Sequence, residues 1–198
     1  MTRVLLARHG QSTWNAEGRW QGQADPPLSE LGREQAHLAA AHVGAVDLIA
    51  SSPQQRALET ATIISSTIGV GPVVVVEQLR ERSAGPWSGL TRIDIDNQYP
   101  GHLASGQRPD GYESDASLLA RTIDGLDQLA ADYPGATLLV VAHGGVIHNL
   151  EQHLGLESGR VPNLAGRVLV RDEEGWLPGE QLLLVDIDRI SGGDPNRI

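Results

Sequence analysis

The stretch LLARHGQSTWN, Leu5–Asn15, decides how the chain begins to fold. Its apolar run ends abruptly at Arg8, His9 and Gly10, so a cation, an imidazole and a glycine stand at the tip of the first expected strand. Three other apolar runs are equally short and continuous: 46–50, 73–76 and 137–142. Continuous apolar runs are typical of strands buried on both faces, as in a parallel sheet.

Helical patterns separate these runs. Apolar residues three and four positions apart predict four helices: 28–43, 53–68, 115–133 and 146–154. Ser29 is the expected N-cap of the first helix, and Pro53 the expected first helical position of the second. Strands that alternate with helices predict an α/β fold, here a three-layer α/β/α sandwich with a mainly parallel central sheet.

The last third of the chain has a different character. Residues 168–170 and 181–187 are expected to form antiparallel edge strands joined through 174–179, and 191–198 to form a frayed tail. The segment 82–112, here named the lid insertion, is rich in Gly, Pro, Arg and Ser and is expected to be a long irregular connection. With no linker in sight, we interpret residues 1–198 as a single domain.

Composition excludes several classes of function. There is no cysteine, which excludes disulfides, thiol catalysis and cysteine-based metal sites. The first apolar run is too short for a signal peptide, and no stretch reaches the ~18 apolar residues of a membrane span, so we expect a cytoplasmic protein with no membrane partner. The net charge of −10 makes nucleic acid an improbable partner. A phosphate site would therefore need a local pocket of positive charge.

Polar side chains follow all four expected parallel strands. Arg8 and His9 follow the first strand, and Arg56 lies early in the helix after the second. Glu81 follows the third strand, and His143, Gly144 and Gly145 follow the fourth. Ligands of open α/β sheets bind outside the carboxyl ends of the strands, so we expect these side chains to converge on one rim.

The converging residue types suit phosphoryl transfer. Arginines bind phosphate through a rigid fork, and a neutral His9 can attack phosphorus to form a phosphohistidine. The neighbouring arginines disfavour protonation of His9. Glu81 could protonate the leaving alcohol and then activate water. A metal site is not expected, because His143, His148 and His153 are five residues apart and face different sides of a helix.

Four segments resemble the histidine phosphatase superfamily, which includes the cofactor-dependent phosphoglycerate mutases. RHGQSTWN (8–15) resembles the R-H-G-x-T/S-x-x-N signature, and SSPQQRALETA (51–61) resembles S-x-x-x-R-A-x-x-T-A. LRERSAGPWSG (79–89) resembles the acid-bearing L-x-E-x-x-x-G-x-W-x-G, and VVAHGG (140–145) the final V-x-H-G-G. The match runs in the family's order from about residue 4 to about 154.

The resemblance implies a role for each matched residue. His9 would be the nucleophile, Glu81 the proton donor, and Arg8, Arg56 and His143 the phosphate ligands. The remaining expected substrate contacts are Asn15 at the pocket edge, Gln21, Gly22 and Gly144. No metal and no cofactor are implied, and dimers are common in this family, which makes a homodimer an expectation as well.

The function expected from these residues is hydrolysis of small phosphorylated metabolites through a phosphohistidine. The enzyme would have either broad specificity or a preference for sugar or glycerate phosphates such as glucosyl-3-phosphoglycerate. Two alternatives remain: a mutase-type phosphotransferase, and a non-catalytic module that only binds phosphate. The stretch PDGYES (109–114) departs from the P-G-G-E-S of many relatives, so the identity of the substrate stays open.

Overall fold

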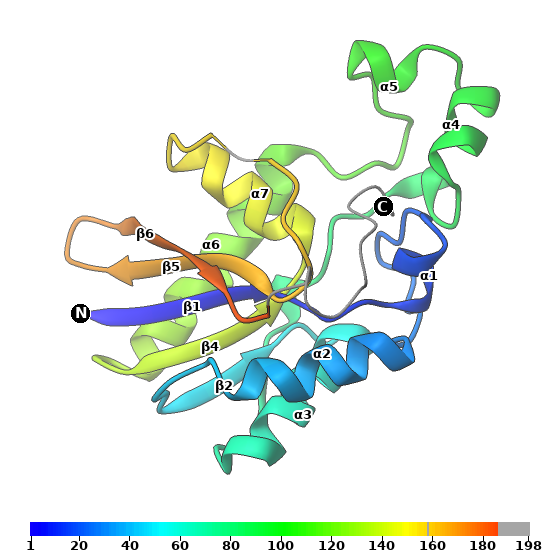
Figure 1. Cartoon of the computed structure of the whole chain (residues 1–198). Helices are drawn as coiled ribbons and strands as arrows, with labels where there is room; N and C mark the ends of the chain where they lie inside the picture. The colour runs from blue at the N-terminus through cyan, green and yellow to red at the C-terminus, as the bar shows by residue number, and fades with distance from the viewer. Residues whose placement is uncertain (158, 186–198) are drawn as a thin grey trace.

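The computed structural model describes residues 1–157 and 159–185. Its centre is a six-stranded sheet in the order β3-β2-β4-β1-β5-β6 (Figure 1). The parallel strands are β1 (Thr2–Arg8), β2 (Leu48–Ser51), β3 (Val74–Val75) and β4 (Thr137–Ala142). The antiparallel strands are β5 (Ala165–Arg171) and β6 (Trp176–Leu183), on one edge. The mainly parallel sheet with an antiparallel edge is thereby confirmed.

Four long helices complete a three-layer sandwich (Figure 1). The helices α2 (Glu30–Ala40) and α3 (Gln55–Ile68) cover one face, and α6 (Asp115–Asp132) and α7 (Gly144–His153) cover the other. The alternation of β1 explains this arrangement, since Val4 and Leu6 pack in the α6/α7 cluster while Leu5 and Ala7 pack in the α2/α3 cluster. The central strand is thus buried on both faces, as its continuous apolar run predicts.

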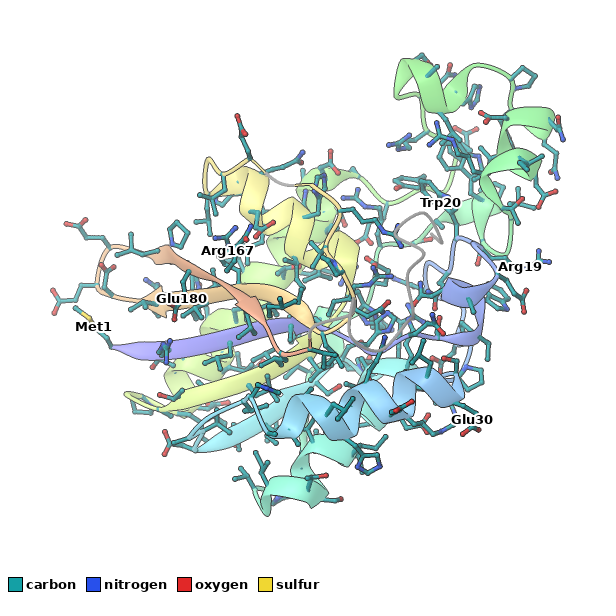
Figure 2. The ribbon with its side chains drawn as sticks, viewed as in Figure 1. Met1, Arg19, Trp20, Glu30, Arg167 and Glu180 are labelled. Carbon is teal, nitrogen blue, oxygen red and sulfur yellow. The ribbon has the colours of Figure 1, made fainter. Side chains whose placement is uncertain are left out.

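The lid insertion is not irregular, which corrects the sequence-based expectation. It contains the 3₁₀ helix η2 (Gly85–Trp87) and the short helices α4 (Arg92–Gln98) and α5 (His102–Ser105). Its buried residues Ala84, Trp87 and Ile95 form a small cluster of their own. Trp20, from outside the insertion, packs edge-to-face on Trp87 with ring centroids 5.2 Å apart, and Figure 2 shows Trp20 beside this part of the molecule.

Several element boundaries also differ from expectation. Pro53 precedes α3 rather than opening it, because Gln54 is the N-cap and the first helical N–H, that of Gln55, donates to Asp25 Oδ1 at 2.7 Å. The helix α7 begins at Gly144, two residues early. Ser29 caps α2 as expected, accepting from the N–H of Gly32.

The turn between the two antiparallel strands is shorter than expected. Strand β6 begins at Trp176, so Pro178 and Gly179 lie within the strand. A proline is tolerated there because β6 is an edge strand and its pairing with β5 is irregular between Arg167 and Leu169. Residues 186–187 of the expected strand and the expected tail 191–198 lie outside the described residues.

Two short elements, α1 (Thr13–Ala16) and η1 (Glu77–Leu79), lie in the connections that follow β1 and β3. Across the described ranges, no helix is both long and apolar enough to cross a membrane. Within the same ranges, no three His, Cys, Asp or Glu side chains gather as a group that could hold a metal ion. The single-domain, cytoplasmic and homodimer assignments stay predictions.

Candidate active site

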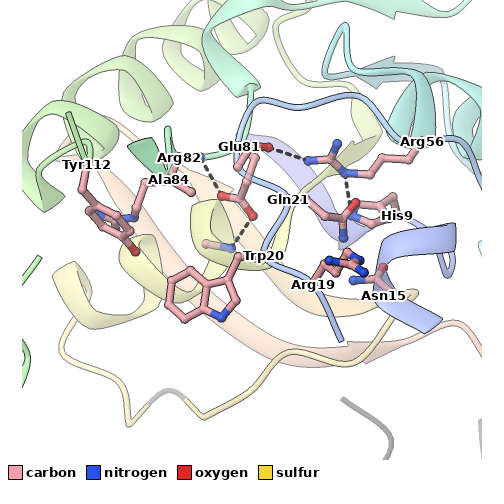
Figure 3. A pocket seen from close by; sticks show the side chains of 12 residues that line it. His9, Asn15, Arg19, Trp20, Gln21, Arg56, Glu81, Arg82, Ala84 and Tyr112 are labelled. Atoms are coloured by element: carbon pink, nitrogen blue, oxygen red, sulfur yellow. Dashed lines mark hydrogen bonds between the residues drawn. The ribbon is translucent and has the colours of Figure 1, made fainter. Parts of the chain in front are cut away.

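The site lies where three parallel strands end. His9 follows β1, Ser52 follows β2 and His143 follows β4. The imidazole rings of His9 and His143 have centroids 5.3 Å apart. The guanidinium of Arg56, in the first turn of α3, donates from Nε to His9 Nε2 at 3.2 Å (Figure 3). The structure therefore brings residues from three distant segments around one imidazole.

The surroundings of His9 fix its tautomer. Its Nδ1 lies 2.6 Å from the carbonyl oxygen of Gly10, which can only accept, so Nδ1 carries the proton. Arg56 Nε can only donate, so Nε2 holds the unshared electron pair. Burial, followed by the charges of Arg56 and Arg8, lowers the pKa of His9 well below its ordinary value. The ring is neutral at pH 7, with a nucleophilic nitrogen at Nε2.

Two arginines at the site, Arg56 and the partly buried Arg8, are held by backbone carbonyls. Arg56 is 1% exposed and donates to the carbonyl oxygens of Gly22 and Ala24, and burial lowers its pKa to about 10. Arg8 donates from Nη1 to the carbonyl oxygen of Val161 at 2.7 Å, and burial likewise lowers its pKa to about 10. Both guanidinium groups remain charged at neutral pH, so they can neutralise an anion in an otherwise acidic protein.

Two buried polar atoms at the site lack partners in the part of the chain that the structure describes. They are Arg8 Nε and His143 Nδ1. The Nε2 atom of His143 already contacts Ser52 Oγ at 2.8 Å, and burial lowers the pKa of this histidine well below its ordinary value. Buried polar atoms are nearly always hydrogen-bonded, so these two atoms without partners suit a polar ligand.

The carboxylate of Glu81 is held by two backbone N–H groups. Oε1 accepts from the N–H of Arg82 at 2.7 Å, and Oε2 accepts from the N–H of Gly145 at 3.0 Å (Figure 3). A Cβ at Gly145 would clash with Glu81 Oε1, so any larger residue here would displace the carboxylate. The backbone N–H of Glu81 donates to Gln54 Oε1 at 2.6 Å, which ties the acid-bearing segment to the start of α3.

Twelve residues line a cavity of about 250 Å³ at this site. Six of them are sequence-predicted site residues: His9, Asn15, Gln21, Gly22, Arg56 and Glu81. Arg8, His143 and Gly144 are not among the lining residues. Gly144 instead lies against the Arg8 side chain, where a Cβ would be 3.5 Å from Nε.

Two amide side chains present donors to this cavity. Asn15 Oδ1 accepts from the N–H of Ser12, and Gln21 Oε1 accepts from Ser12 Oγ at 2.8 Å. Since both amide oxygens already accept hydrogen bonds within the protein, the amide nitrogens remain as donors, which suit phosphate oxygens. Asn163, which is not among the lining residues, donates from Nδ2 to the carbonyl oxygen of His9 at 2.8 Å.

Sequence reasoning did not assign the other half of the lining. Arg82 and Ala84 lie within the matched segment 79–89, and Trp20 lies shortly after the first signature; the remaining residues are Arg19, Tyr112 and Gly145. Gly145 belongs to the matched VVAHGG segment and is expected at this rim, although the sequence gives it no role of its own. Arg19 and Tyr112 carry no such signal, and Tyr112 reaches the site only because the tertiary fold brings the end of the lid insertion there.

A second cavity of about 700 Å³ adjoins the first and shares four of its residues: Trp20, Arg82, Tyr112 and Gly145. Its wall includes Arg108, whose guanidinium carbon lies 5.4 Å from the Trp87 ring centroid and 5.3 Å from that of Tyr112. The inner cavity is thus small and cationic, while the outer one is wider and has an aromatic wall with an exposed cation on it.

Comparison with known proteins places this geometry among phosphatases. A family model described as the histidine phosphatase superfamily (branch 1) matches residues 4–176. A metal-independent phosphoserine phosphatase of Arabidopsis thaliana is 33% identical over 189 residues, which are 89% of this chain and 79% of the relative. A glucosyl-3-phosphoglycerate phosphatase of Mycolicibacterium vanbaalenii is 38% identical, covering 83% of this chain and 79% of the relative.

Solved structures agree with the sequence relatives. A mycobacterial glucosyl-3-phosphoglycerate phosphatase in complex with VO3 superimposes with a TM-score of 0.83 at 32% identity, covering 91% of this chain and 99% of that one. A mutant phosphoserine phosphatase of Entamoeba histolytica in complex with phosphoserine has a TM-score of 0.79 at 26% identity, with 93% and 98% covered.

Proposed function

Because this chain belongs to the histidine phosphatase superfamily (branch 1) and is a phosphatase of that superfamily, we propose that it hydrolyses small phosphomonoesters through a phosphohistidine at His9. The observation that carries the proposal is the buried, neutral imidazole whose Nε2 holds an unshared pair beside two charged arginines. Neutral histidine is the form that attacks phosphorus.

The first step transfers the phosphoryl group to the enzyme. His9 Nε2 forms a bond to phosphorus while the bond from phosphorus to the ester oxygen breaks. Protonated Glu81 gives its proton to that oxygen, so the leaving group departs as a neutral alcohol. Arg8, Arg56 and His143 stabilise the negative charge on the three phosphoryl oxygens, which accept hydrogen bonds from groups held in place by the fold.

The second step returns the enzyme to its starting state. The Glu81 carboxylate takes a proton from water as the water oxygen attacks phosphorus, and the bond between phosphorus and Nε2 breaks. Inorganic phosphate leaves, and Glu81 is again protonated for the next substrate. No step needs a metal, in keeping with the name of the Arabidopsis relative, metal-independent phosphoserine phosphatase.

The outer cavity supports a leaving group larger than a simple alkyl chain. Its aromatic wall and its arginines suit a polar, acidic leaving group of the sugar or glycerate type. The relatives fit this class, since one is named for glucosyl-3-phosphoglycerate and another for phosphoserine, and both compounds carry a carboxylate. We therefore include both in the substrate range proposed for this chain.

Phosphate release from a panel of monoesters, including glucosyl-3-phosphoglycerate, phosphoserine and 3-phosphoglycerate, tests the proposal. Wild-type protein should release phosphate, and His9→Ala should abolish turnover while the control His42→Ala, at an exposed helix-end histidine, keeps it. Added chelator should have no effect. Turnover by His9→Ala at the wild-type rate contradicts the mechanism.

The same assay separates the two alternatives. Isomerisation of 3-phosphoglycerate without net phosphate release indicates a mutase, which would pass the phosphoryl group to a second hydroxyl. Binding of inorganic phosphate with no release from any monoester indicates a non-catalytic module.

A further inference from the structure

Arg121 in α6 has no part in the chemistry described above, yet its guanidinium faces the segment that carries Glu81. Nε and Nη2 donate to the two carboxylate oxygens of Glu113, each at 2.8 Å. Nη2 also donates to the carbonyl oxygen of Glu81 at 3.1 Å, and Nη1 donates to the carbonyl oxygens of Gln78 and Arg80. All five N–H bonds of the guanidinium therefore have acceptors.

Glu113, the residue after the lid insertion, also contacts the segment that carries Glu81. Its Oε2 accepts from the N–H of Ser83 at 3.1 Å, and its backbone carbonyl accepts from Arg82 Nη1 at 2.8 Å. Burial acts to raise the pKa of Glu113, but the hydrogen bonds and charge of Arg121 prevail and hold it below its ordinary value. Residues 78–83 are thus held by hydrogen bonds to the Arg121–Glu113 ion pair. This pair is mostly buried, with 19% of the Arg121 side chain and 13% of the Glu113 side chain exposed.

The hydrogen bonds of the Arg121–Glu113 pair hold the backbone beside Glu81, the proposed proton donor. One of the two N–H groups that hold the Glu81 carboxylate belongs to Arg82, inside the clamped segment, and the backbone of Glu81 itself is bonded to Arg121. We propose that Arg121 is a positioning residue for proton transfer by Glu81, an inference that rests on the proposed function. The fork of a guanidinium meets one carboxylate and three converging carbonyls, which the three donors of a lysine cannot reproduce.

A comparison of substrates with poor and good leaving groups tests this positioning role of Arg121. Proton donation matters for an alkyl phosphate, whose alkoxide is a poor leaving group, and matters little for p-nitrophenyl phosphate. Arg121→Lys should lower kcat for glycerol phosphate on the order of 10–100-fold, a part of the roughly 10²–10⁴-fold that a general acid contributes, because Glu81 is misplaced rather than removed. For p-nitrophenyl phosphate the loss should stay below about threefold.

Arg167→Lys is the matched control. Arg167 in β5 forms a comparably buried pair with Glu151, with Nε and Nη2 each 2.8 Å from Oε1, and lies away from Arg19 and Trp20 of the site (Figure 2). This variant should lose stability similarly, measured as the free energy of unfolding in urea, without changing the ratio of the two rates. Glu113→Gln keeps the shape of the side chain but removes its charge, and it should change the ratio of the two rates in the same direction as Arg121→Lys. It is the variant to use if Arg121→Lys does not fold.

A double variant decides whether Arg121 acts through Glu81. In a Glu81→Gln background the proton is already missing, so adding Arg121→Lys should cause no further loss on glycerol phosphate. Equal losses on both substrates, or a full additional loss in the Glu81→Gln background, would overturn the inference. If Glu81→Gln itself affects both substrates equally, the proposed role of Glu81 fails, which is a different result.

Discussion

Gly145→Ala is the sharpest test of how the proton donor is held. The added Cβ would lie 2.3 Å from Glu81 Oε1, and contacts under 3.0 Å are essentially never seen for real Cβ atoms. The carboxylate must therefore retreat, which breaks or weakens the 3.0 Å hydrogen bond between the Gly145 N–H and Oε2. Hydrogen bonds to charged groups contribute about 1.5–3 kcal/mol, so the expected loss in rate is about 10–100-fold when the group's position counts only in the transition state.

The assay is kcat/KM for glycerol phosphate and for p-nitrophenyl phosphate, with thermal unfolding recorded for each variant. The loss should be confined to glycerol phosphate, because only its leaving group needs the proton. Gly159→Ala is the control, since a Cβ there would meet nothing within 4 Å. If Gly145→Ala keeps the wild-type kcat/KM for glycerol phosphate, the carboxylate does not work from the position described.

Three further predictions concern stability. As the pH is lowered through 6.5, the free energy of unfolding should decrease by at most about 1.4 kcal/mol per pH unit for each of His9 and His143. Burial lowers the pKa of both histidines in the folded chain, so the unfolded chain binds more protons in acid. Urea titrations at pH 7.5 and 5.5 measure this change, and an unchanged free energy of unfolding contradicts it. Trp87→Ala should expose the lid insertion to limited proteolysis, since removing a fully buried tryptophan costs about 3–5 kcal/mol; unchanged cleavage would count against a separate lid cluster. Gly10→Ala should lower the melting temperature strongly, because its Cβ would lie 2.6 Å from the backbone oxygen of Gly32, which cannot move aside as a side chain can; an unaltered melting curve would disprove that contact.

The sequence predicts the part of the site for which a general rule connects a short sequence pattern to a place in the folded structure. The continuous apolar runs predict buried parallel strands, and parallel strands place their carboxyl ends on one edge. His9 and His143 could therefore be expected side by side although 134 positions separate them in the chain. The flanking residues Arg56 and Glu81 follow from the same rule.

The lid insertion could not be predicted in this way. The helices α4 and α5 have seven and four residues, too few to show a clear apolar period. They are stabilised by a cluster that includes Trp87 and by Trp20, which is far from the insertion in sequence. The start of α3 is a similar case, because Asp25, a distant residue, supplies the acceptor for its first N–H.

The role of Arg121 is equally invisible to pattern reasoning. Arg121 is the one basic residue of α6, beside four aspartates, and nothing in the sequence relates it to the carbonyls of 78–81. Convergence of backbone acceptors is a property of the folded chain alone.

The position of β1 in the middle of the sheet has a consequence for synthesis. Both of its neighbours, β4 and β5, come from the last third of the chain, and the backbone of His9 is bonded to Ala142 and Asn163. At ribosomal speeds of about 5–20 residues per second, the amino-terminal strand waits roughly 6–30 s for these partners. During that interval its apolar residues are unpaired, which makes nascent chains stalled before residue 137 both inactive and prone to aggregate.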